Sequence, residues 1–180
     1  TFLLAGSNLK TKDDYMAKIK LAALDVDGTL IRRDLSLSKA VEQALQSLHD
    51  AGVEVAIVTG RTMGELIHFR KLLPWIRYFV VSNGSVGLDA ERNVRFYEKL
   101  LPLDIARAVE REARKYPVMT EVYTEGMSYV NRDCWEHSEL YTAEFLHHFS
   151  LADGRVPVES VGALLDERTE DIEKLYISFR

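Results

Sequence analysis

The stretch that most constrains the fold is a short apolar run that ends at two carboxylates. Residues 21–24 read Leu-Ala-Ala-Leu, and residues 25–29 read Asp-Val-Asp-Gly-Thr. An unbroken apolar run of this length is typical of a strand buried on both faces in a parallel α/β sheet. Ligands bind such sheets at the carboxyl ends of the strands. We therefore expect Asp25 and Asp27 to lie at the ligand-binding edge of a parallel sheet.

The two carboxylates indicate a bound cation. Negative charges this close repel each other, so both ionise readily only beside a neutralising positive charge. Oxygen ligands favour a hard divalent ion, and Mg²⁺ fits best. In different surroundings, one carboxylate can act as a nucleophile and the other as a proton donor and acceptor. The alternative is a strand followed by an Asp-rich turn without a catalytic role, and this stretch alone leaves both possibilities open.

Composition narrows the class of protein. The chain has 180 residues, of which 47% are hydrophobic, enough for a sizeable core and, by length, for one domain. A net charge of −5 without a Lys/Arg stripe argues against a nucleic-acid partner. The lone Cys134 excludes an internal disulfide and is expected to be a packed thiol. No apolar run reaches transmembrane length, so we expect no membrane partner and a cytoplasmic location.

A second predicted strand also ends in polar residues. An amphipathic helix over residues 41–48 leads to a β-rich run at 53–58, which indicates a right-handed parallel crossover. Thr59, Gly60 and Arg61 follow. A hydroxyl, a flexible glycine and the start of the next helix suit a phosphate there, although an ordinary strand-to-helix turn has the same residues. Arg61 could contact the phosphate or form a structural ion pair.

A third predicted strand, residues 78–82, runs into Asn83 and Gly84, a pair typical of a tight hairpin. Asn83 either only makes this turn or adds a polar contact at the mouth of the site. Short strands and helices then alternate to the end of the chain, an α+β pattern. We expect residues 1–15 to be a leader or extension, 16–84 an α/β core and 85–180 a second domain.

Taken together, these stretches resemble the haloacid dehalogenase superfamily. Residues 25–29 resemble its motif I, and residues 59–61 look like its motif II. Residues 82–84 resemble the passage into the cap of the Cof-type branch, which has a type IIB cap. The resemblance covers residues 18–180. It implies the N-terminal part of a Rossmann-like, parallel, three-layer α/β core with an inserted α+β cap domain.

The resemblance also implies a phosphatase. By analogy, Asp25 attacks phosphorus to form an aspartyl-phosphate, and Asp27 protonates the leaving oxygen and then activates water. The Asp25 side chain and the Asp27 carbonyl would bind Mg²⁺. Phosphate contacts would come from Thr59, Gly60, Arg61 and Asn83. The expected substrates are small phosphorylated metabolites such as sugar phosphates; the alternatives are a phosphomutase or phosphotransferase, or a non-catalytic binding fragment.

Two later motifs of the family are not found in this sequence. One is a basic residue, usually lysine, and the other is an acidic cluster that completes the metal site. No lysine lies between Lys115 and Lys174, and Lys174 is expected to be solvated and structural. Asp166 and Asp171 mimic the acidic cluster but are interpreted as a charged helix turn. We therefore expect a fragment of a longer phosphatase, or a chain seen only in part, with reduced metal affinity and turnover.

Overall fold

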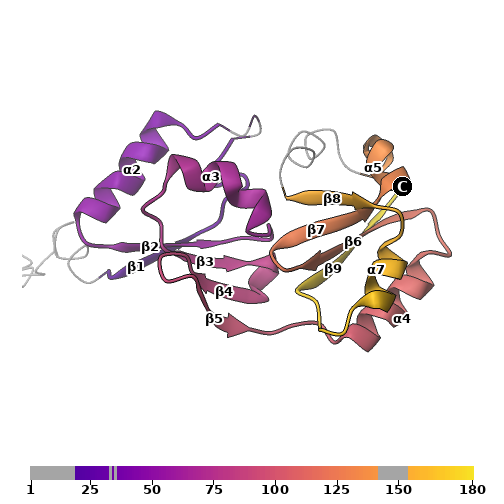
Figure 1. Ribbon diagram of the computed structural model, residues 1–180. Coiled ribbons are helices and arrows are strands. Elements are labelled where there is room, and N and C mark those ends of the chain that lie inside the picture. Colours follow the sequence, from indigo (N-terminus) through magenta and orange to yellow (C-terminus); the bar gives the residue numbers. More distant parts are fainter. Residues whose placement is uncertain (1–18, 33, 35, 142–153) are drawn as a thin grey trace, which may run out of the picture.

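The chain forms two units that lie side by side, each built on its own β-sheet (Figure 1). The computed structural model describes residues 19–32, 34, 36–141 and 154–180. Because the two sheets share no strand, each unit has a separate hydrophobic core.

The first sheet has five strands in the order β1-β2-β3-β4-β5. They are β1 (Leu21–Leu24), β2 (Glu54–Val58), β3 (Tyr78–Val81), β4 (Val86–Asp89) and β5 (Val94–Glu98). The first three are parallel, and β4 and β5 are antiparallel additions. This arrangement confirms the expected α/β class, and the parallel crossovers bring the ends of β1, β2 and β3 to one edge.

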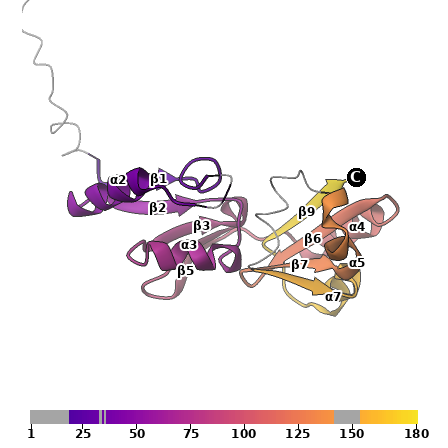
Figure 2. The same cartoon turned by 90° about the horizontal axis from the view of Figure 1, so that it is seen from above.

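Two helices cover one face of this sheet, α2 (Lys39–Asp50) and α3 (Ile67–Leu72), the latter preceded by the 3₁₀ turn η1 (Gly64–Leu66) (Figures 1 and 2). The Ser38 hydroxyl caps α2 by accepting the Val41 N–H at 3.2 Å. The core between helices and sheet includes the following buried side chains: Leu45, Val55, Ile57, Leu66, Phe69 and Phe79. This packing fixes the strands whose ends carry the predicted site residues.

The first strand is less buried than its apolar sequence predicts. Leu21 is 56% exposed, whereas we expected burial on both faces of the strand. The reason is the position of β1, which pairs only with β2 among the described strands. The described helices also lie on a single face, so alternate side chains of β1 point away from them. The expectation that truncation leaves an open edge beside Asp25 stays a prediction.

The strands at 86–89 and 94–98 belong to the first sheet, which corrects their expected place in the second domain. The turn after β3 reverses the chain, so β4 pairs with β3 and β5 with β4. A hairpin signal predicts such a reversal, yet it does not say which sheet the new strands extend. The passage between the two sheets falls at residues 99–102, beyond the expected division at residue 84.

The second sheet has the order β8-β7-β6-β9. Its strands are β6 (Val118–Thr124), β7 (Met127–Asn131), β8 (Arg155–Val158) and β9 (Lys174–Phe179). Its helices are α4 (Leu103–Ala113), the short α5 (Arg132–Glu136), the 3₁₀ turn η3 (Ser138–Leu140) and α7 (Val161–Glu167). Side chains of α4 and α7, including Ala106 and Leu165, pack on Val122 of the sheet.

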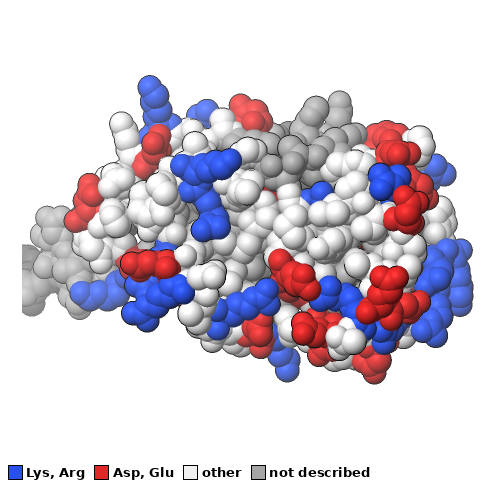
Figure 3. Space-filling view, viewed as in Figure 1, with Lys and Arg blue, Asp and Glu red and all other residues white. Residues whose placement is uncertain are grey.

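The elements predicted in this half are largely confirmed. The ambiguous run at 156–161 becomes the end of β8 and the start of α7. The apolar spacing over 135–149 predicts a helix from the sequence, whereas the structure has α5 ending at Glu136 and only the turn η3 beyond it. Residues 142–149 lie outside the described residues. No helix in the described part of the chain is long and apolar enough to cross a membrane. Figure 3 shows acidic and basic side chains interspersed over the face drawn.

Candidate active site

Asp25 and Asp27 occupy the loop that follows β1 at the carboxyl edge of the first sheet. The loop closes on the carbonyl of Val26, which accepts the N–H groups of Leu30 and Ile31, each at 3.0 Å. Both aspartates are exposed. Asp25 makes no hydrogen bond or ion pair with any residue that the structure describes. The Asp25 carboxylate is therefore uncommitted and open to a ligand.

Arg61 holds the second carboxylate through two parallel bonds. Its Nε donates to Oδ2 of Asp27 at 2.9 Å, and its Nη2 donates to Oδ1 at 2.7 Å. Nη1 donates to the Glu65 carbonyl at 3.2 Å. A bidentate pair of this kind fixes orientation as well as charge. The sequence left two roles open for Arg61, and the structure shows one of them, the ion pair. Contact between Arg61 and a phosphate stays a prediction.

The loops after β2 and β3 are hydrogen-bonded to each other. The Asn83 N–H donates to the Thr59 carbonyl at 3.2 Å, and the Ser82 N–H donates to the Arg61 carbonyl at 2.8 Å. Asn83 also lies directly against Gly60, because a Cβ built on Gly60 would be only 2.4 Å from Asn83 Oδ1. Asn83 thus makes the hairpin and also reaches the second loop of the site.

The turn after β3, within the 3₁₀ segment η2 (Ser82–Gly84), has a strained backbone. Ser82 and Asn83 are both left-handed, with φ of 53° and 59°. Two such residues in succession cost energy and persist only where their surroundings hold them. Ser82 is fully buried, and its hydroxyl donates to Glu173 Oε2 at 2.7 Å. A carboxylate of the second unit therefore helps to hold a turn at the candidate site.

Thr59 places a buried hydroxyl at the end of β2. Its side chain is 5% exposed, and Oγ1 accepts the N–H of Arg61 at 3.2 Å. The hydroxyl hydrogen has no acceptor among the described residues. A hydroxyl and adjacent N–H groups at a strand end are suitable donors for an anion.

The described residues provide part of a magnesium site. Mg²⁺ commonly uses one or two carboxylates and keeps water or substrate oxygens as its other ligands. The uncommitted Asp25 carboxylate and the carbonyl of Asp27 fit this pattern, while the Asp27 carboxylate is occupied by Arg61. No cluster of three or more His, Cys, Asp or Glu suited to a metal exists within the described ranges. The residues present therefore fit an ion that shares its coordination with solvent and substrate.

Lys174, at the start of β9, reaches the candidate site from the second unit. Its ammonium donates to the Gly60 carbonyl at 2.8 Å and lies 3.9 Å from the ring centre of Tyr123. Burial lowers the pKa of this lysine, because a charged amine is less stable away from water. We expected a solvated Lys174, but the side chain is half-buried between the two units and its ammonium is bonded to the first unit.

A buried charge cluster lies next to this lysine. Arg155 Nε donates to Glu121 Oε2 at 2.9 Å and lies 3.8 Å from Glu65 Oε1. Glu121 is fully buried, and its Oε2 also accepts from Ser128 Oγ at 2.8 Å. Burial raises the pKa of Glu65, although its bond from the Thr62 N–H opposes the shift. The sequence does not predict this cluster, because only the fold brings Glu65, Glu121 and Arg155 together.

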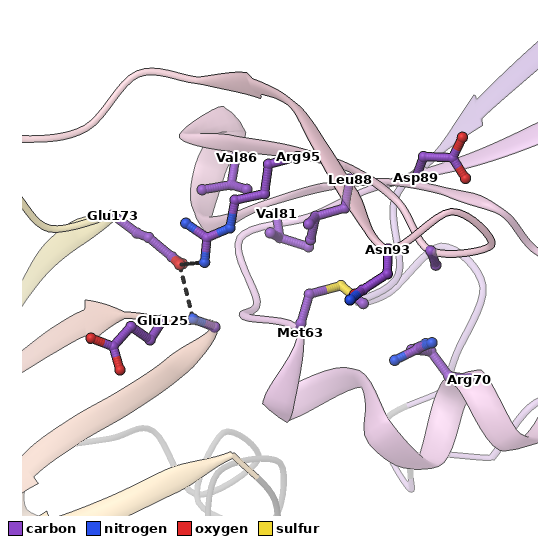
Figure 4. Close-up of a pocket in the computed structure, with 12 residues that line it drawn as sticks. Met63, Arg70, Val81, Val86, Leu88, Asp89, Asn93, Arg95, Glu125 and Glu173 are labelled. Carbon is purple, nitrogen blue, oxygen red and sulfur yellow. Dashed lines mark hydrogen bonds and ion pairs between the residues drawn. The ribbon is translucent and has the colours of Figure 1, made fainter.

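Glu173 joins the two units beside a cavity of about 380 Å³ (Figure 4). Its Oε1 accepts the Gly126 N–H at 2.9 Å and lies 3.6 Å from Arg95 Nη2. Met63 and Arg70 line the cavity from the helical side, and the two predicted catalytic aspartates do not line it. This cavity is therefore distinct from the candidate active site.

The other conspicuous residues have structural roles. Asp171 Oδ1 accepts the Leu103 N–H at 2.9 Å at the start of α4, so it does not belong to an acidic metal motif. Asn131 Oδ1 accepts the Val161 N–H at 2.8 Å at the start of α7. Cys134 is buried, and burial raises the pKa of its thiol, as expected for a packed cysteine.

The sequence matches a family with this fold. The family model described as haloacid dehalogenase-like hydrolase matches residues 22–176, so the chain belongs to that family. A Bacillus subtilis haloacid dehalogenase-like hydrolase has a similar structure, with a TM-score of 0.69 and 22% identity over 86% of this chain and 59% of that one.

Relatives with closer sequences are assigned as phosphatases. A Streptococcus pyogenes protein predicted to be a phosphatase is 32% identical over 124 residues, which cover 67% of this chain and 46% of that protein. An HMP-PP phosphatase of Cronobacter sakazakii is 33% identical over 90 residues, which cover 50% of this chain and 33% of the enzyme. The chain thus spans less than half the length of these two relatives.

Proposed function

We propose that the whole protein is a Mg²⁺-dependent phosphatase of small phosphorylated metabolites, and that it works through an aspartyl-phosphate on Asp25. The observation that carries this proposal is the uncommitted carboxylate of Asp25 next to a second, oriented carboxylate on Asp27. The loops with Thr59 and Asn83 meet at the same edge of the sheet. Family membership and the phosphatase names of the relatives support the same reaction class.

The reaction would proceed in two displacements. An oxygen of Asp25 attacks phosphorus, the bond from phosphorus to the leaving oxygen breaks, and a proton passes from Asp27 to that oxygen. Asp27 then takes a proton from water, whose oxygen attacks phosphorus and releases Asp25 and inorganic phosphate. Because both Asp27 oxygens accept bonds from Arg61, one of them must leave the guanidinium and take up a proton from solvent before Asp27 can protonate the leaving oxygen.

The loop after β2 would bind the phosphoryl group. The Thr59 hydroxyl and the Gly60 N–H are the proposed donors, and Asn83 packs against Gly60 to hold that backbone in place. A magnesium ion on Asp25 and the Asp27 carbonyl would supply positive charge opposite the phosphate oxygens. Donors fixed in advance cost little reorganisation when negative charge develops.

Phosphate release by paired variants tests the proposal. With Mg²⁺ and a panel of sugar phosphates, we expect the whole protein to release inorganic phosphate. Asp25→Asn should lower the rate by on the order of 10³-fold or more, because the attacking oxygen is lost. Asp27→Asn should lower it by roughly 10²- to 10⁴-fold through loss of proton transfer.

The matched control is Asp50→Asn, which makes the same change of charge at the exposed end of α2. It should keep the full rate. Full activity in Asp25→Asn, or equal activity with and without a chelator of Mg²⁺, would contradict the proposal. Transfer of phosphate to a second hydroxyl, without release of inorganic phosphate, would instead identify a phosphotransferase or phosphomutase.

A further inference from the structure

Lys174 is held in an unusual way for a lysine between two packed units. Its ammonium donates one hydrogen bond, to the carbonyl of Gly60, and its remaining neighbours include two aromatic rings. The ring centres of Tyr123 and Tyr176 lie 3.9 and 5.9 Å from Nζ. An ammonium has three donors and a full charge, so these contacts satisfy it only in part.

No described carboxylate forms an ion pair with Lys174. Glu65 and Glu121 lie close enough to influence its charge, yet Arg155 engages both of them. Glu173, the preceding residue, accepts bonds from Ser82 and Gly126. The carboxylates around the lysine therefore have other partners.

A half-buried cation without a counter-ion is costly, and an anion placed beside it removes much of that cost. Burial lowers the pKa of Lys174, and the nearby charges of Glu65 and Glu121 oppose this shift only in part. The position of the Lys174 ammonium places it close to the proposed phosphate site. It contacts the carbonyl of Gly60, and the N–H of the same residue is the proposed donor to the transferred phosphoryl group.

We propose that Lys174 binds a second anionic group of the substrate, adjacent to the phosphoryl group that is transferred. This inference rests on the proposed phosphatase function and narrows its substrate class. The preferred substrates carry a further phosphate or carboxylate near the reacting phosphate, and monophosphates of neutral alcohols are poorer. Lys174 is then a specificity-determining residue, supplied by the second unit when it lies against the first.

Two pairs of compounds separate the sources of the second negative charge. Glycerol 3-phosphate and 3-phosphoglycerate have similar size, and only the latter adds a carboxylate. Inorganic phosphate and inorganic pyrophosphate make the corresponding pair for a second phosphate. kcat/KM is measured for the first pair, and binding by titration calorimetry for the second.

The variant Lys174→Met removes the cation, Lys174→Arg keeps it, and Lys115→Met removes an exposed lysine that pairs with Glu112. In Lys174→Met we expect kcat/KM for 3-phosphoglycerate, or affinity for pyrophosphate, to fall roughly 10- to 100-fold. The values for glycerol 3-phosphate and phosphate should change by less than about threefold. Lys174→Arg should keep most of the preference, and Lys115→Met all of it.

Equal losses for both members of each pair would overturn the inference, because Lys174 would then contact the transferred phosphoryl group itself. Unchanged values in a folded Lys174→Met protein would overturn it too, because the lysine would only join the units. If the proposed phosphatase function is wrong, the experiment gives a different result. In that case neither ester is hydrolysed, while the calorimetric comparison of phosphate with pyrophosphate still decides the role of Lys174.

Discussion

Gly60 is the residue at which two loops of the candidate site come closest. Its N–H is a proposed phosphate donor, its carbonyl accepts from Lys174, and the Asn83 amide lies where a side chain would begin. We expect Gly60→Ala to displace Asn83, because the new Cβ would be 2.4 Å from its Oδ1. The predicted result is a fall in kcat/KM of about tenfold or more, since small misplacements at a reacting centre are costly.

A double variant separates this clash from a general loss of flexibility. Asn83→Gly removes the obstructing amide and retains a backbone that tolerates the left-handed conformation. In that background, the additional cost of Gly60→Ala should largely disappear. Additive costs of the two substitutions would show that Asn83 does not confine Gly60.

At the residue scale, the sequence predicted the positions that follow strand ends. Asp25, Thr59 and Asn83 could be found because each stands directly after an apolar run. The sequence alone did not identify the group that Arg61 binds, because a guanidinium pairs equally well with a phosphate or a carboxylate. Lys174 was misjudged because its burial depends on contact between two units.

At the scale of elements, an ion pair closes the β3–β4 hairpin at the end opposite the turn that carries Asn83. Arg77 Nε donates to Asp89 Oδ1 at 2.9 Å, and Nη2 to Oδ2 at 2.5 Å. These bonds lower the pKa of Asp89 from 3.8 to about 2. A carboxyl whose pKa is depressed by folding adds stability above its unfolded pKa, and this stability is lost as pH falls through the folded value.

The predicted consequence is a pH-dependent effect of Asp89→Asn. At neutral pH the variant should unfold at a lower temperature or urea concentration than the wild type. The difference should shrink as pH falls from 3.8 and vanish below about 2, where Asp89 is protonated in both states. Glu91→Gln, at an exposed partner of Arg77, is the control and should show a smaller difference. A constant difference across this range would contradict the assigned pKa.

The elements themselves were mostly predictable from periodicity. Alternating or unbroken apolar runs gave β2, β3, β6 and β7, and the helical spacing gave α2 and α4. The sheet to which β4 and β5 belong was not predictable, because pairing is decided by the free edge of β3 and not by their own residues. The exposure of β1 was missed for a similar reason, since burial depends on neighbours that the strand sequence does not specify.

At the scale of the whole molecule, close backbone contacts join the two units near η1. The Gly64 N–H donates to the Gly126 carbonyl at 2.8 Å. A Cβ on Gly154 would lie 2.3 Å from the Glu65 nitrogen and 2.4 Å from the Gly64 carbonyl carbon. Because backbone atoms cannot turn aside as a side chain can, glycine at 154 permits this approach.

We therefore expect Gly154→Ala to move the units apart and to weaken substrate binding by the second unit. Hydrogen exchange at the Gly64 amide should become faster, since its bond to Gly126 is lost. Gly126→Ala is a matched control, with φ of 74° against 76° and a nearest contact of 3.5 Å to Met63. The Gly126→Ala variant has similar backbone strain, but its new Cβ does not clash with the backbone of Gly64 and Glu65. Equal exchange at Gly64 in both variants would contradict the role given to Gly154.

If Asp25 is the nucleophile, an acid-quenched reaction should trap the phosphoryl group on its side chain. The protein is mixed with substrate and Mg²⁺, stopped in acid within one turnover, and digested for peptide mass analysis. We expect one added phosphoryl group on the peptide that contains Asp25, and none in Asp25→Asn. Phosphate release without a phosphorylated peptide at any quench time, or a phosphoryl group on another residue, would contradict it.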